Sequence, residues 1–129
     1  MEIRDNSNEL LAIILKFNEF KNGKYCATDN SEEFQWASVD LNKDEVIERH
    51  YHPEQKRNIR KTSEVIVVLD GKIEIEIYDN DLNFVYKDFL SFGDTVSLIS
   101  GGHGLKIIDD SKFVEVKQGP FIPEEDKKR

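Results

Sequence analysis

The chain has 129 residues, 38% of them hydrophobic, and a formal net charge of −8. Its length fits one domain with its own core, and its composition excludes a disordered chain. Such an acidic chain repels nucleic acid and anionic membranes, so we expect neither as a partner. The single cysteine, Cys26, excludes an intrachain disulfide, and no apolar run approaches the roughly 20 residues that span a bilayer. We therefore expect a cytoplasmic protein.

Short apolar runs separated by Asn, Asp and Gly clusters indicate an all-β domain, because no long segment with a 3.6-residue period intervenes. The run at residues 10–17 predicts a buried strand, with a short helix as the alternative. Further strands are expected, in chain order, at residues 34–41, 46–52, 64–69, 72–78, 84–89, 95–99, 103–108 and 113–116. We expect one β-sandwich or barrel over residues 1–129, with its core at 10–120 and a charged tail at 121–129.

The dipeptide Asp70-Gly71 is the strongest turn signal. Asp-Gly is typical of two-residue β-hairpins, so it predicts a hairpin between the strands at 64–69 and 72–78. The second of these strands alternates strictly, which predicts that its isoleucines share one face. These isoleucines are Ile73, Ile75 and Ile77.

The three histidines are the first candidates for chemistry. His50 and His52 lie two residues apart in an alternating segment, and a strand would place both side chains on the same face. Neighbouring imidazoles suit a metal, because each offers a neutral nitrogen donor. An incidental surface pair explains this motif equally well when it is taken alone.

Two further residues extend this set. Glu64 opens an apolar strand, where a buried carboxylate is costly unless it is paired or bound to a metal; an exposed strand edge is the alternative. His103 follows the glycine-rich bend Ser100-Gly101-Gly102, which can turn sharply and bring a side chain into a cavity. A plain hairpin turn beside a surface histidine is the alternative there. Three imidazoles and one carboxylate suit iron, manganese, nickel, zinc or copper, and they leave coordination positions open.

These motifs resemble those of the cupin family. The first cupin motif is a glycine, His-x-His, a short gap, Glu, six residues and Gly; His50-Tyr51-His52, Glu64 and Gly71 fit its core. The second is a glycine, a short strand, a turn of small residues and His, which Gly93 to His103 fits. The chain departs from the pattern in a gap of eleven residues between His52 and Glu64, so residues 53–63 form an insertion. It also lacks the usual proline of the second motif.

The resemblance implies a cupin-type β-barrel, that is, a double-stranded β-helix or jelly roll. It implies one divalent transition metal (Fe, Mn, Ni or Zn) held by His50, His52, Glu64 and His103. It also implies a homodimer. The stretch at residues 101–121 is similar to a subgroup of bacterial cupins, some of which occur in polysaccharide or nucleotide-sugar contexts.

Two other groups are candidates for the site. The cluster at residues 56–61 carries four cations and no acid, so Arg57, Arg60 and Lys61 are candidates to bind a phosphate or carboxylate; a solvated loop is the alternative. On the last strand, Glu115 and Lys117 share one face and are candidates for an acid or base if Val114 and Val116 point outward. An exposed face is the alternative.

Two functions follow from these residues together with the resemblance, and the sequence leaves open whether the protein is an enzyme. The first is a metal-binding cupin that acts on a small polar metabolite, as a sugar-derivative isomerase or epimerase or as a metal-dependent dioxygenase. The second is a non-catalytic module that binds or senses a small molecule, with a structural metal or none. A turnover assay with the metal intact separates the two.

Overall fold

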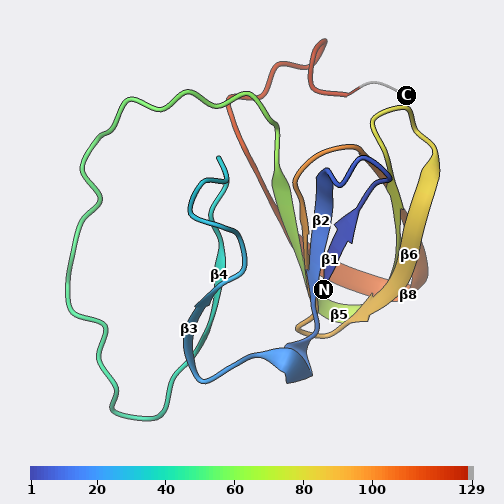
Figure 1. Ribbon diagram of the computed structural model, residues 1–129. Coiled ribbons are helices and arrows are strands. Elements are labelled where there is room, and N and C mark those ends of the chain that lie inside the picture. The colour runs from blue at the N-terminus through green and yellow to red at the C-terminus, as the bar shows by residue number, and fades with distance from the viewer. Residues whose placement is uncertain (128–129) are drawn as a thin grey trace. The chain divides into compact units, whose positions relative to one another are not determined.

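The computed structural model describes residues 1–127, and its regular structure is antiparallel β-sheet apart from one short 3₁₀ helix (Figure 1). The prediction of an all-β protein is therefore confirmed. The chain divides into two compact units: the sheet unit, residues 1–19 and 61 onward, and the hairpin unit, residues 20–60. The prediction of one domain over residues 1–129 remains a prediction, and the last two residues of its charged tail lie outside the described residues.

The sheet unit contains six strands. They are β1 (Glu2–Arg4), β2 (Leu10–Leu15), β5 (Glu64–Tyr78), β6 (Phe84–Ser91), β7 (Thr95–Leu98) and β8 (Gly102–Lys117), with the 3₁₀ helix η1 at Phe17–Glu19. The sheet runs in the order β1-β2-β7-β5-β6, and β8 also pairs with β5. All of these pairs are antiparallel.

Strand β5 organises this sheet. Its first residues, Glu64–Val67, pair with β7, its last residues, Lys72–Tyr78, pair with β6, and β8 pairs with it over both parts. Among residues 1–127 these pairings do not close the sheet into a barrel. The cupin-type barrel therefore remains a prediction, while the antiparallel all-β class is established.

The core lies on one face of this sheet. Ile73, Ile75 and Ile77 have exposed fractions of 0%, 0% and 1%, which confirms that they share a buried face. They pack with a cluster of aliphatic side chains from β2, β5, β6 and β7, which includes Leu11, Ile14, Ile66, Val68, Leu90 and Val96. Burying each such side chain stabilises the fold by about 1.5–3 kcal/mol. The alternating isoleucines of β5 therefore decide which face of this strand points to the core.

The hairpin predicted at Asp70-Gly71 is wrong, because β5 continues through these residues. Gly71 adopts a φ of +79°, and the register against β8 shifts on both sides of it. The Ser111 hydroxyl of β8 accepts a hydrogen bond from the Lys72 backbone N–H at 3.0 Å, which supports the irregular stretch. The glycine thus permits a bulge, not a reversal, since the two halves of β5 do not pair with each other and β8 pairs with both of them.

The last strand also differs from the prediction. The segments 103–108 and 113–116 belong to one strand, β8, whose irregular middle lies opposite the bulge of β5. β1 is a strand that the sequence pattern did not predict, since its three residues are too few to show a period.

The hairpin unit contains a two-stranded antiparallel sheet of β3 (Gly23–Cys26) and β4 (Ala37–Asp40). The strand expected at residues 34–41 is therefore shorter than predicted. The strand expected at residues 46–52 is wrong, because this segment has no strand pairing and its side chains are exposed. Val46 and Ile47 are 81% and 64% exposed, so the alternation there has no core to face.

The described part of the chain contains no helix that is long and apolar enough to cross a membrane.

Candidate functional site

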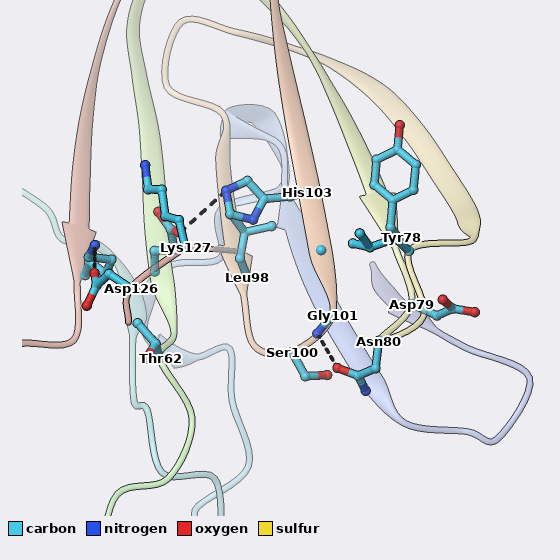
Figure 2. Close-up of a pocket in the computed structure, with 14 residues that line it drawn as sticks. Thr62, Tyr78, Asp79, Asn80, Leu98, Ser100, Gly101, His103, Asp126 and Lys127 are labelled. Carbon is cyan, nitrogen blue, oxygen red and sulfur yellow. Dashed lines mark hydrogen bonds and ion pairs between the residues drawn. The ribbon is translucent and has the colours of Figure 1, made fainter. Parts of the chain in front are cut away.

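A pocket of about 730 Å³ lies in the sheet unit, where β5 begins and where β8 both begins and ends (Figure 2). Its size is that of a small-molecule site. The turns at residues 79–82 and 100–101 form one side, and residues 126–127 contribute to the other. Most of the lining side chains are polar or charged: Thr62, Glu64, Tyr78, Asp79, Asn80, Ser100, His103, Lys117, Asp126 and Lys127.

Glu64 and His103 meet in this pocket. Glu64 is the first residue of β5 and His103 the second residue of β8, and His103 Nε2 lies 3.5 Å from Glu64 Oε1. Their side chains are 12% and 30% exposed. Two residues that are 39 positions apart in the sequence are thus brought together, while their role as metal ligands remains a prediction.

Burial sets the protonation of both groups. Burial raises the pKa of the Glu64 carboxyl, and the nearby Glu115 carboxyl adds to this rise. Burial lowers the pKa of the His103 imidazole, against the opposing influence of Glu115. Both shifts favour the uncharged forms, because burial withdraws water from the ionised ones. An uncharged imidazole is the form that binds a metal.

The pairing of β5 with β8 places Glu115 and Lys117 on the same face of β8, but of these two only Lys117 lines the pocket, because Glu115 is exposed. Glu115 lies opposite the fully buried Ile66, and Lys117 lies opposite Glu64. Opposed residues of an antiparallel pair share a face. Val114 and Val116, on the other face, are 45% and 52% exposed, so exposure does not separate the two faces at Glu115.

Lys117 is engaged by an acid. Its Nζ contacts the Asp126 carboxylate, and this hydrogen bond raises the pKa of Lys117 and lowers that of Asp126. Lys117 therefore stays a cation at neutral pH, which suits the binding of an anion better than the removal of a proton. The roles of Glu115 and Lys117 as acid or base remain predictions.

His50 and His52 lie in the hairpin unit, in a segment without strand structure. Their ring centroids are nevertheless 5.1 Å apart. Nδ1 of His50 is 2.9 Å from the Glu48 carbonyl, and in the tautomer that donates this bond Nε2 is the nitrogen left for a metal. The pair thus keeps the proximity, although not the strand, that the motif predicted.

The four predicted metal ligands fall into these two pairs, one in each unit. Among residues 1–127, no three His, Cys, Asp or Glu side chains form a group able to hold a metal ion. The four-residue metal site, and with it a divalent Fe, Mn, Ni or Zn ion, remains a prediction.

The predicted anion-binding cations are also divided. Arg57 and Arg60 are exposed residues of the hairpin unit, where the Arg60 backbone N–H donates a 2.8 Å hydrogen bond to Glu33 Oε2. Lys61 begins the second segment of the sheet unit. Their role as a clamp for phosphate or carboxylate remains a prediction.

Sequence reasoning missed several residues of the pocket. Asp126 and Lys127 lie in a run of charges that is typical of a solvated tail, and nothing in that run indicates a return to the sheet. Asn80 lies in a turn, where its side chain accepts a 3.2 Å hydrogen bond from the Gly101 N–H and so links the two turns that line the pocket (Figure 2). Nothing in the sequence spacing of Asn80 and Gly101 indicates this hydrogen bond.

No protein-family model matches the chain, and comparison with curated proteins and with solved structures finds no significant match.

Proposed function

We propose that this protein is a metal-binding protein of the cupin type whose pocket accepts a small polar metabolite. Glu64 and His103 supply two ligands to one divalent transition metal: iron, manganese, nickel or zinc. The observation that carries this proposal is the 3.5 Å approach of His103 Nε2 to Glu64 Oε1 at the wall of a pocket.

The donor set fits such an ion. His103 Nε2 and Glu64 Oε1, 3.5 Å apart, would both be able to reach one ion, since two bonds of about 2.1 Å span up to about 4 Å. Imidazole nitrogen and carboxylate oxygen are a mixed set that suits these metals. Two ligands are too few for a stable site, and the His-x-His motif of the sequence supplies the candidates for the others, His50 and His52.

When bound, the metal would supply Lewis-acid or redox chemistry to an oxygen atom of the metabolite. The residues of the chain bind and orient that metabolite. Thr62 offers a hydroxyl group to a molecule rich in hydroxyls. Ser100 and Asn80 already make hydrogen bonds within the chain, and they keep an acceptor site on the hydroxyl oxygen and a second amide hydrogen, respectively, for such a molecule. This lining supports a sugar derivative as the metabolite, with isomerisation, epimerisation or an oxygen-dependent step as the reaction.

One observation favours the second function, a binding or sensing module without catalysis. Lys117 is a candidate general base, but its contact with Asp126 holds it in the protonated form. Glu64, whose pKa is raised, is then the better placed group to carry a proton. A metal bound to its carboxylate oxygens would prevent that role, which leaves the second function. Turnover of candidate sugar derivatives by the metal-loaded protein distinguishes an enzyme from a binding module.

Metal analysis tests the proposal. Protein purified without chelators or a histidine tag is measured beside Glu64→Gln and His103→Ala, and near-stoichiometric metal that falls in both variants is the expected result. Glu76→Gln is the matched control, because it removes the same kind of carboxylate from the same strand. Glu76 lies opposite Gly104, the residue after His103, so its side chain is on the other face of the sheet from His103. Wild-type protein that contains no metal, and takes up none of iron, manganese, nickel or zinc, would overturn the proposal.

A further inference from the structure

The C-terminal segment, residues 118–127, turns back to the pocket after β8 ends at Lys117. Its first anchor is the Gln118 backbone N–H, which donates a 3.0 Å hydrogen bond to the Ser63 carbonyl. The segment then forms a turn in which the N–H groups of Glu125 and Asp126 each bond the Ile122 carbonyl at 3.0 Å. This turn positions Asp126 in the wall of the pocket, as Figure 2 shows.

The second anchor is an ion pair within the pocket. Asp126 Oδ2 contacts Lys117 Nζ, and its other oxygen accepts a 3.3 Å hydrogen bond from the Ile122 N–H. The two side chains are only 10% and 18% exposed. A carboxylate and an ammonium that are this far removed from water depend on one another, since an unpaired buried charge is costly.

The same ammonium is also contacted by an aromatic ring of this segment. Lys117 Nζ lies 4.7 Å from the centroid of the Phe121 ring, a distance at which the ring face attracts a cation. Two residues of the segment, Asp126 and Phe121, thus converge on one lysine of β8. The segment has no helix or strand of its own, so these contacts and the Gln118 bond hold it in place.

We propose that Lys117 is the anion-binding residue of the pocket and that the Asp126 carboxylate is an internal competitor for it. In this arrangement Asp126 occupies the position of the anionic group of a ligand. A small metabolite that carries a carboxylate or phosphate would displace Asp126, pair with Lys117 and release residues 118–127. The inference rests on the proposed function only in taking this pocket as the ligand site.

Competition has a quantitative consequence. If the ion pair is closed in all but one-tenth to one-hundredth of the molecules, the apparent affinity for an anion is reduced about 10-fold to 100-fold. Removing the Asp126 charge should raise the apparent affinity for the anion by the same factor. Removing the Lys117 charge should abolish the binding, whichever residue occupies position 126.

The experiment is an NMR titration of the full chain with inorganic phosphate and, separately, with acetate. Asp126→Asn should bind at least one of them about tenfold or more tightly than wild type, and the double variant Asp126→Asn, Lys117→Gln should lose that gain. Glu125→Gln is the matched control, since it removes the same charge from the neighbouring residue. The stronger of the two probes identifies phosphate or carboxylate as the preferred group.

Equal affinities of Asp126→Asn and Glu125→Gln for both probes would overturn the inference and leave the ion pair as a purely structural contact. A readout on wild-type protein guards against a variant that fails to fold. Phosphate or acetate should accelerate hydrogen exchange at the amides of Gln118 and Asp126, and unchanged exchange at saturation would contradict displacement. Titrations with and without a chelator separate this result from the metal proposal. Anion binding that depends on Lys117 in the metal-free protein would support the inference even if the metal analysis finds no metal.

Discussion

Glu64 lies opposite Lys117 in the β5–β8 pairing, and both side chains line the pocket. The Lys117 charge lowers the pKa of Glu64, but burial and the Glu115 carboxyl act in the other direction, and the net pKa is raised. Burial of Glu64 therefore outweighs its neighbouring cation.

Glu64→Gln should raise the free energy of unfolding at pH 7 in the presence of a chelator. Because the pKa of Glu64 is higher in the folded protein than in the unfolded chain, its ionisation above that pKa destabilises the fold. The gain is about 1.4 kcal/mol for each unit of displacement of the pKa. Below the unfolded value both states are protonated, so the gain should vanish there. Denaturant unfolding from pH 3 to pH 8 measures it, and a gain that does not depend on pH would contradict the argument.

Gly71→Ala should cost more stability than Gly23→Ala. Both glycines have positive φ angles, +79° and +87°, so at either position an alanine in this left-handed conformation lowers the free energy of unfolding by about 1–2 kcal/mol. Only at Gly71 would the new Cβ also meet other atoms, 2.2 Å from the Asp110 carbonyl oxygen, which adds about 1–3 kcal/mol. Chemical denaturation of the two variants makes the comparison. Equal losses would show that the bulge relaxes without cost.

His52→Ala should lower the metal content of the purified protein if the His-x-His motif supplies ligands. Tyr51→Ala is the control: Tyr51 lies between the two histidines, is 84% exposed, and offers no imidazole. Elemental analysis of both variants beside wild type gives the answer. Full metal in His52→Ala together with metal loss in His103→Ala would leave a site that does not use the motif.

The predicted homodimer can be tested on the outer face of β8. Val114 and Val116 lie opposite Val67 and Val65 and are half exposed, and apolar groups on a sheet face favour association. Val116→Lys should change the sedimentation of the protein from a two-chain to a one-chain mass. Asp110→Lys, in the exposed middle of β8, should leave the mass unchanged. A wild-type protein that sediments as one chain would contradict the prediction.

The sequence by itself determined the all-β class and the buried face of Ile73, Ile75 and Ile77. Alternation and glycine-rich turns are local signals, and each is read directly from neighbouring residues. Predictions from local signals were wrong where the choice of partner strand decides whether a segment forms a hairpin or a strand. Asp70-Gly71 is a hairpin signal only when its flanking strands pair with each other, and here the two halves of β5 pair with β8 and, on the other edge, with β7 and β6.

Only the tertiary structure decided the place of the charges. Residues 46–52 alternate like a strand but have no partner, so they remain exposed. Asp126, in a run that is typical of a solvated tail, is instead drawn into the pocket by Lys117. The reason is physical: the pairing energy of a strand or of a buried charge comes from a residue distant in the sequence, and no local pattern records where that residue lies.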